Sequence, residues 1–230
     1  MTVAASSPPP PALSPSGGEG ASGISPRFVA LLDGEGLAGR RVLDIGCGWG
    51  RLSLLLAPRA RGVVGLDRDA ATIRDANERL AASGLANVEF HVVDVEQEEY
   101  DRWAPDLITA HLCASDAIIE RAGRALEPDR CLALVAFHVD QWRETGKVSR
   151  FAYDEARMEA ALRRSGLKPE VVEVEREITR FASVEEGLAA TVGLEDRWRA
   201  DGRWHRYLAF LESGGRTLTR SHLIVIGRKS

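Results

Sequence analysis

The chain has 230 residues, of which 44% are hydrophobic and 28% charged, and its formal net charge is −4. This length and composition suit one ordinary globular α/β domain, and the acidic balance gives no overall attraction for nucleic acid or for an anionic membrane. No apolar run approaches the roughly 20 residues that span a bilayer, and the first residues do not resemble a secretory signal. Cys47, Cys113 and Cys131 are widely spaced without a C-x-x-C pair, so neither a disulfide framework nor a metal site is expected, and a cytoplasmic location is predicted.

Residues 1–24 hold five prolines, many serines and glycines, and no Lys or Arg. Such a segment buries too little apolar surface to offset the entropy of ordering, which predicts a disordered tail. A proline-rich ligand for a partner is the alternative. The rest of the chain, 25–230, is expected to form a single domain.

From Ser25 onward, short apolar runs alternate with amphipathic segments. Ser25-Pro26 is typical of a helix cap and first turn, and further helices are predicted at 51–60, 68–84, 115–127, 153–166, 183–193 and 203–215. Strands are predicted at 40–46, 62–67, 87–94, 106–111, 131–138, 170–181 and 219–229. Strands separated by helices of this length predict an α/β fold, a three-layer αβα sandwich whose ligands bind at the carboxyl ends of the strands.

Glycine occupies every second position in "VLDIGCGWG", residues 42–50, directly after the first predicted strand. Glycine permits a tight turn into the following helix and lets main-chain N–H groups approach a ligand closely. The N-terminus of that helix favours an anionic group at the same place. The loop is therefore expected to hold a small polar ligand against bare backbone.

Two ligands suit such a loop, a dinucleotide or S-adenosylmethionine. The dinucleotide pattern G-x-G-x-x-G requires glycine at position 51, where Arg51 stands. Asp44, two residues before Gly46, would repel a pyrophosphate and attract the ammonium of an amino acid. This comparison favours S-adenosylmethionine.

With Asp67 and Asp94 at the ends of the next two predicted strands, "VLDIGCGWGRLSLLLA" resembles the first motif of the class I S-adenosylmethionine-dependent methyltransferases. The resemblance covers roughly 27–140 and extends to "PDLITAH" and "LEPDRCLALV". It implies a Rossmann-like, seven-stranded, mostly parallel sheet with an antiparallel last strand. It also implies a cofactor-binding half at 25–140 and an acceptor-side half with the closing strands at 141–230.

The same resemblance assigns roles to single residues. Asp67 would hold the ribose hydroxyls and Asp94 would lie near the adenine amino group, while Arg68 stands where the family often has an apolar residue and would stack on the adenine ring instead. Trp49 would either wall the cofactor pocket or pack under the first helix. The residues expected to bind the cofactor are Asp44, Gly46, Cys47, Gly48, Trp49, Gly50, Asp67, Arg68, Asp94, Val95 and His111.

A sulfonium methyl group is already electrophilic, so the main task of such an enzyme is to align the acceptor. A general base is needed only if the acceptor arrives protonated. His111, at the end of the fourth predicted strand, is the first candidate for a base that titrates near neutrality; alternatively it only hydrogen-bonds the cofactor or the backbone. His138, at the end of the fifth strand, is the second candidate.

The acceptor region, 140–215, is rich in aromatic residues, which favours a small organic acceptor, although most of these rings are expected to anchor short helices: Trp142, Phe151, Tyr153, Phe181, Trp198, Trp204 and Tyr207. Eight basic and three acidic side chains in 196–230 keep an RNA or protein acceptor open as an alternative. A third hypothesis is a protein that binds S-adenosylmethionine without transferring its methyl group.

Overall fold

The computed structural model describes residues 23–230. The tail predicted at 1–24 lies almost wholly outside the described residues. Its last residue, Ile24, is 2% exposed and packs in a hydrophobic core beside Phe28 and Leu32. The packed part of the chain therefore begins before Ser25, and the Ser25 hydroxyl caps the first helix by accepting from Phe28 N, as its position predicted.

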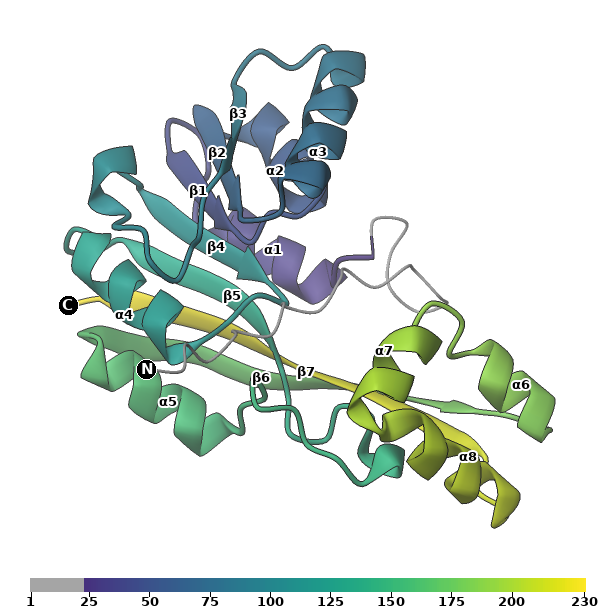
Figure 1. The fold of residues 1–230 in the computed structure, drawn as a ribbon. Coiled ribbons are helices and arrows are strands. Elements are labelled where there is room, and N and C mark those ends of the chain that lie inside the picture. Colours follow the sequence, from purple (N-terminus) through teal and green to yellow (C-terminus); the bar gives the residue numbers. More distant parts are fainter. Residues whose placement is uncertain (1–22) are drawn as a thin grey trace, which may run out of the picture.

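Seven strands form one sheet in the order β3-β2-β1-β4-β5-β7-β6, with helices on both faces (Figure 1). This confirms the predicted three-layer, Rossmann-like architecture. The strands are β1 Arg41–Ile45, β2 Gly62–Asp67, β3 Val88–Val92, β4 Leu107–His111, β5 Cys131–Phe137, β6 Leu167–Arg180 and β7 Thr217–Lys229. The helices are α1 Pro26–Gly34, α2 Arg51–Leu56, α3 Ala70–Ser83, α4 Asp116–Ala125, α5 Glu155–Arg164, α6 Val184–Ala189, α7 Glu195–Asp201 and α8 Arg203–Glu212.

The first five strands run parallel to one another, and β7 runs antiparallel to both β5 and β6. The central register aligns Asp44 of β1 with Gly65 of β2 and with Thr109 of β4. Because parallel strands end at the same edge of a sheet, the segments that follow β1, β2, β3, β4 and β5 meet along one edge. That edge carries the candidate site.

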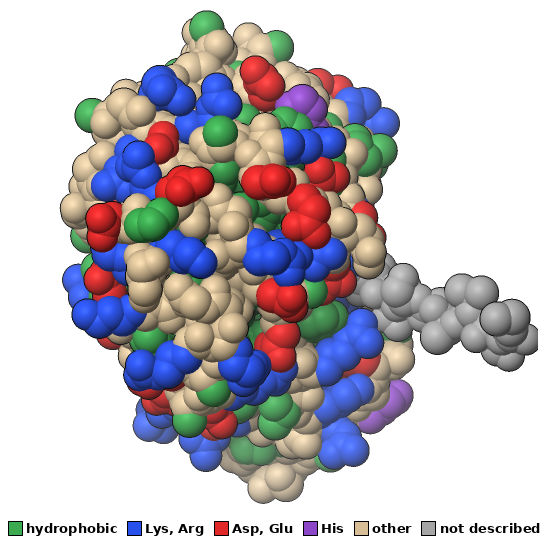
Figure 2. All heavy atoms as spheres, turned by 90° about the vertical axis from the view of Figure 1, so that its left-hand side faces the viewer, with side chains coloured by type: hydrophobic (Ala, Val, Ile, Leu, Met, Phe, Trp, Pro, Cys, Tyr) green, Lys and Arg blue, Asp and Glu red, His purple; other side chains and the backbone are tan. Residues whose placement is uncertain are grey.

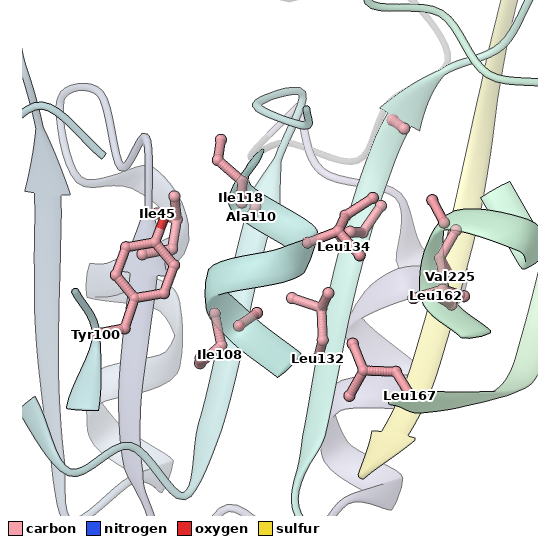
Figure 3. Packing of buried hydrophobic residues seen from close by; sticks show 14 of the residues in the cluster. Ile45, Tyr100, Ile108, Ala110, Ile118, Leu132, Leu134, Leu162, Leu167 and Val225 are labelled. Carbon is pink, nitrogen blue, oxygen red and sulfur yellow. The ribbon is translucent and has the colours of Figure 1, made fainter. Parts of the chain in front are cut away.

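Each face of the sheet has its own hydrophobic core, because successive side chains of a strand point to opposite faces. The core under α1, α2 and α3 takes Cys131, Ala133 and Val135 from β5. The core under α4 and α5, part of which Figure 3 shows, takes the residues between them, Leu132, Leu134 and Ala136. A strand buried on both faces explains the uninterrupted apolar run of residues 131–137 in the strand predicted at 131–138.

Helix α5 begins two residues later than predicted because Tyr153 continues the sheet. The Tyr153 N–H donates to Phe137 O at 2.9 Å, and the Val139 N–H donates to Tyr153 O at 3.1 Å. Asp154 then caps the helix by accepting from Arg157 N. The sequence interpretation also missed α7, which lies between two predicted helices, and α6 ends at Ala189, four residues before the predicted end.

A third hydrophobic cluster lies apart from the two sheet cores, where α6, α7 and α8 pack beyond α1–α5 along the long β6–β7 pair (Figure 1). Its centre is Trp198, fully buried, with Trp142 at 5.3 Å and Tyr207 at 5.5 Å between ring centroids. Trp204 belongs to the same cluster, and Phe181 packs against it. Five of the seven aromatic residues considered for the acceptor pocket are thus anchors of this cluster.

We expect Gly123→Ala to lower the free energy of unfolding by about 1–3 kcal/mol, because the new Cβ would overlap the Ser165 carbonyl oxygen and lie 3.0 Å from its carbon. The Ser165 carbonyl is backbone at the end of α5 and cannot swing aside, so α4 and α5 would have to separate. Gly34→Ala is the matched control, since Gly34 is also helical but has no atom within 4 Å of the new Cβ. Urea unfolding of both variants measures the difference, and equal stability of the two would contradict this packing.

Candidate functional site

A cleft of about 1280 Å³ opens at the carboxyl ends of the parallel strands. Asp44 and Cys47 line a smaller cavity of about 40 Å³, which shares Gly46 and His111 with the cleft. Gly50 lines neither space. Of the residues expected to bind the cofactor, the cleft brings together Gly46, Gly48, Trp49, Asp67, Arg68, Asp94, Val95 and His111.

The three glycines after β1 are required by the backbone and by their neighbours. Gly46, Gly48 and Gly50 have φ values of 65°, 53° and 83°, in the left-handed region that residues with a Cβ rarely adopt. A Cβ on Gly46 would overlap the Cys113 side chain, and one on Gly50 would lie 2.6 Å from Cζ of Phe90. A Cβ on Gly48 would have its nearest neighbouring atom 3.9 Å away, so the backbone at this position is not covered by other side chains.

Asp67, the last residue of β2, is held in place by the turn itself. Its Oδ2 accepts from the Gly48 N–H at 2.9 Å, and its Oδ1 accepts from the Asp69 N–H at 3.0 Å. A carboxylate oxygen has a second lone pair, so each oxygen can still accept from a ligand hydroxyl in the cleft. The pair of vicinal hydroxyls on a ribose suits this arrangement.

Asp44 is 1% exposed, and its Oδ2 accepts from the Ser53 hydroxyl of α2 at 2.6 Å. Burial raises the pKa of its carboxyl to about 7, and the nearby Asp67 carboxylate contributes to the rise. At neutral pH this group can therefore ionise at little cost when a cation arrives in the adjoining cavity. An ammonium group would meet a full negative charge there.

Trp49 is half-buried and lines both the cleft and the smaller cavity, which favours the pocket-wall role over packing alone. The guanidinium carbons of Arg79 and Arg51 lie 4.6 and 5.6 Å from its ring centroid. Its indole N–H is buried and has no acceptor in the described part of the chain. A buried donor without a partner costs free energy, so a ligand that supplies an acceptor would be favoured here.

Cys47 plays a packing role in this arrangement. Its side chain is 8% exposed and lies so close to β2 that a Cβ on Gly65 would be 3.0 Å from its sulfur. Burial and the nearby carboxylates raise the pKa of its thiol far above the usual value. The thiol therefore stays protonated and contributes shape to the wall of the smaller cavity.

At the end of β3, Asp94 and Val95 form the opposite wall of the cleft. The Asp94 Oδ1 accepts from the Glu96 N–H at 3.1 Å, and the Val95 carbonyl accepts from the Tyr100 hydroxyl at 2.5 Å. These bonds fix the segment while Asp94 stays exposed to the cleft. Asp67 could accept from the hydroxyls of a ribose, and Asp44 could pair with an ammonium group. Because the glycine turn between them carries no side chain that would block a ligand, these residues fit S-adenosylmethionine.

The prediction that His111 titrates near neutrality is wrong. Burial, together with the neighbouring His222 and Arg51, lowers the pKa of its imidazole to about 3. Burial likewise lowers the pKa of His222 to about 4, and its Nε2 has no partner in the described residues. His111 lines the cleft as a neutral ring, able to take part in a hydrogen bond but a weak base.

His138 does not line the cleft, so the sequence-based choice of this residue as a second base is wrong in position. Its Nδ1 accepts from the Asp140 N–H at 3.2 Å and lies 3.0 Å from the Ser221 hydroxyl. Its Nε2 lies 3.4 Å from a Glu155 carboxylate oxygen. With both ring nitrogens engaged, His138 ties the end of β5 to β7 and α5.

The sequence interpretation missed most of the remaining cleft wall. Residues 112–118 after β4 line it continuously, starting with Leu112, whose φ of 58° is strained for a side chain of this kind. Phe137 at the end of β5 and Arg150 also contribute, and of the aromatic candidates only Phe151 and Tyr153 do so. The general rule that ligands bind at strand ends predicts this edge, although no motif marks these residues individually.

Within residues 23–230 no helix is long and apolar enough to cross a membrane, and no group of three or more His, Cys, Asp or Glu side chains could hold a metal ion.

Comparison with known proteins agrees with this geometry. A family model described as a methyltransferase domain matches residues 37–189. The 23S rRNA (uracil(1939)-C(5))-methyltransferase RlmD of Stenotrophomonas maltophilia is 44% identical over 59 residues, which are 26% of this chain and 13% of that protein. The matched region spans between 13% and 18% of the length of the curated relatives.

Two solved structures share the fold at low sequence identity. The YcgJ protein of Bacillus subtilis has a TM-score of 0.69 and 16% identity, and the match covers 88% of this chain and 98% of that one. Magnesium protoporphyrin IX methyltransferase of Synechocystis PCC 6803, solved with bound S-adenosylmethionine, has a TM-score of 0.56 and 17% identity, with 89% and 76% covered. At these identities the likeness establishes the architecture alone.

The low pKa values of His111 and His222 predict a loss of stability in acid. Their folded pKa values of about 3 and 4 lie below the ordinary 6.5, so the unfolded chain binds protons first as the pH falls below 6.5. Each of these two histidines should lower the free energy of unfolding by up to about 2 kcal/mol between pH 7 and pH 5. The raised pKa of Asp44 acts in the opposite sense over the same range, so wild type and variants must be compared.

We therefore expect His111→Gln and His222→Gln each to flatten the decline in the free energy of unfolding between pH 7 and pH 5, whatever their effect at pH 7. His205→Gln is the control, because His205 is exposed on α8. Denaturant unfolding at several pH values gives the slopes. Unchanged slopes in both variants would contradict the low pKa values of the two imidazoles.

Proposed function

The chain belongs to the class I S-adenosylmethionine-dependent methyltransferase family, and from that premise we propose that it transfers the methyl group of S-adenosylmethionine to a small-molecule acceptor bound in the cleft. The continuity of the cleft is the observation that supports a small acceptor. One space runs from Asp67 and Gly48 to an apolar wall that includes Phe137 and Phe151. A pocket that is mostly apolar and carries a few placed polar groups is typical of small-molecule sites.

When bound, S-adenosylmethionine supplies an electrophilic methyl group, which an acceptor atom takes as the carbon–sulfur bond breaks and a neutral thioether leaves. The protein contributes placement, which can supply about 7–11 kcal/mol of the barrier reduction. Asp67 and Asp44 would hold the two ends of the cofactor, and the wall after β4 and β5 would hold the acceptor. Neutral His111, between these regions, would accept a hydrogen bond from an acceptor O–H or N–H group, with its low pKa limiting it to orientation.

RNA is the second candidate acceptor, because the curated relatives act on rRNA according to their names. The basic excess in 196–230 gives it little support, since most of these cations are engaged within the chain. Arg197 and Arg203 lie over the Trp142 ring. The face shown in Figure 2, which lies on the other side of the molecule from α7 and α8, also has basic and acidic side chains interspersed. Four more bond or pair with other groups of the chain: Arg199, Arg216, Arg228 and Lys229. A surface of mixed sign does not resemble the basic stripe of an RNA-binding protein.

The same cysteines that predicted a reducing compartment are free in the structure, which supports a cytoplasmic setting as part of this proposal.

The proposal is tested by incubating the purified protein with methyl-labelled S-adenosylmethionine and a cell extract separated into small molecules, RNA and protein. We expect label in the small-molecule fraction. Label in RNA or protein would assign the acceptor to the second class, and cofactor binding without transfer to any fraction would make the chain a non-catalytic binder.

Asp67→Ala should weaken the binding of S-adenosylmethionine by more than about 1.5 kcal/mol, or roughly tenfold, because the ribose hydroxyls lose a charged acceptor and the Gly48 N–H loses its partner. Titration calorimetry with the demethylated product measures the change. Asp196→Ala, which removes an exposed carboxylate on α7, is the control for net charge. Unchanged affinity in a folded Asp67→Ala protein would remove Asp67 from the binding site.

A further inference from the structure

One cation in the acceptor half of the cleft is left without an ionic partner. Arg150 is exposed and lines the cleft, and its guanidinium carbon lies 4.6 Å from the centroid of the Phe151 ring. Within residues 23–230 the Arg150 side chain makes this ring contact and no hydrogen bond or ion pair, and no carboxylate lies beside it. A guanidinium held over a ring keeps its five N–H donors directed outward along its plane.

The other charged groups at this end are already paired. Asp116 accepts from the Tyr153 hydroxyl at 2.6 Å and lies 3.7 Å from both Arg157 and Arg164. Arg157 in turn donates to the Ala152 carbonyl at 2.9 Å and lies over the Tyr153 ring at 4.3 Å. These contacts balance the charge of Asp116 and occupy Arg157. In the acceptor half of the cleft, Arg150 is therefore the cation available to a ligand.

The remaining carboxylates of the cleft lie on the segments that follow β2 and β3, which form its cofactor half. Asp67 is bonded to the glycine turn, Asp94 to the Glu96 N–H, and Asp69 to the first turn of α3. Asp75 on α3 and Glu96 after β3 complete this acidic side. Apart from Asp116, the carboxylates of the cleft therefore lie where the cofactor would bind, together with Arg51 and Arg68, and Arg150 stands without a carboxylate beside it where the acceptor would bind.

The wall beside Arg150 is rigid and apolar. Tyr153 is 1% exposed, and its backbone continues the sheet beyond β5 through bonds to Phe137 and Val139. Phe151, two residues earlier, is thereby anchored close to the end of β5. Leu112, Ala114 and Ile118 supply the apolar surface from the segment after β4. Such a wall suits a flat or apolar body rather than a sugar or a polyamine.

We infer that the acceptor is a small organic anion, with an apolar body against the Phe151 wall and a non-reacting carboxylate or phosphate paired with Arg150. This inference rests on the proposed function and narrows its substrate class. The guanidinium would select the acceptor by its charge and fix the distance from the anionic group to the methylated atom. Neutral analogues would leave Arg150 without a partner and lose that orientation.

The experiment separates a small-molecule extract on an anion-exchange resin at pH 7 into a retained and an unretained pool. Each pool is incubated with the full chain and methyl-labelled S-adenosylmethionine. We expect transfer to the retained pool, and the labelled product itself to be retained because its anionic group does not react. Treating the pool with phosphatase beforehand distinguishes the sources, since it abolishes transfer only if the anion is a phosphate ester.

Variants connect this charge preference to Arg150. Arg150→Met should lower kcat/KM for the retained pool roughly 10- to 100-fold, the range of a lost charge-assisted hydrogen bond. Arg150→Lys should recover part of the loss, and the affinity for the demethylated cofactor should stay unchanged in both. Arg102→Met is the matched control, because Arg102 is also exposed over a ring, 4.5 Å from the Trp103 centroid, but does not line the cleft.

Transfer to the unretained pool, or equal rates for Arg150→Met and Arg102→Met, would overturn the inference while leaving methyl transfer to a small molecule intact. Cofactor binding with no transfer to either pool would instead overturn the proposed function, and the inference with it.

Discussion

The site depends on one close approach, that of the Cys113 side chain to the bare Cα of Gly46. This contact brings the segment after β4 against the turn after β1, so that both border the same cleft. Any side chain at position 46 would push the two segments apart. Leu112, the residue before Cys113, has a left-handed backbone conformation. The spacing of glycines in this turn thus reflects crowding behind it as much as access for a ligand in front.

The architecture was predictable because its signals are local and repeated. The run 131–137 is apolar at every position, which only a strand buried on both faces requires, and Gly84 ends α3 in a left-handed conformation at the predicted residue. What could not be predicted depends on distant partners. Tyr153 joins the sheet through Phe137, and α7 is a seven-residue helix stabilised mainly by burying Trp198.

The presence of Gly46, Asp67 and Asp94 in one cleft was predictable for the same reason, since these residues occupy fixed places relative to strand ends. The behaviour of the histidines was not. The sequence places His111 at a strand end, where an imidazole is usually solvated, but the low pKa arises from burial and from His222 on β7, more than a hundred residues away in the chain. Ionisation reflects three-dimensional surroundings, which no spacing rule encodes.

The long β6–β7 pair carries a group of helices that has a hydrophobic core separate from the cores of the central sheet. Helices α6, α7 and α8 share an aromatic core that contains none of the residues lining the cleft. Apart from the ring contact of Trp142 with Phe137, local opening of this appendage would therefore leave the cleft packed, and its protection against amide hydrogen exchange should differ from that of the central strands. Such a division also bears on evolution, because the appendage can change in length and composition while the cleft keeps its shape.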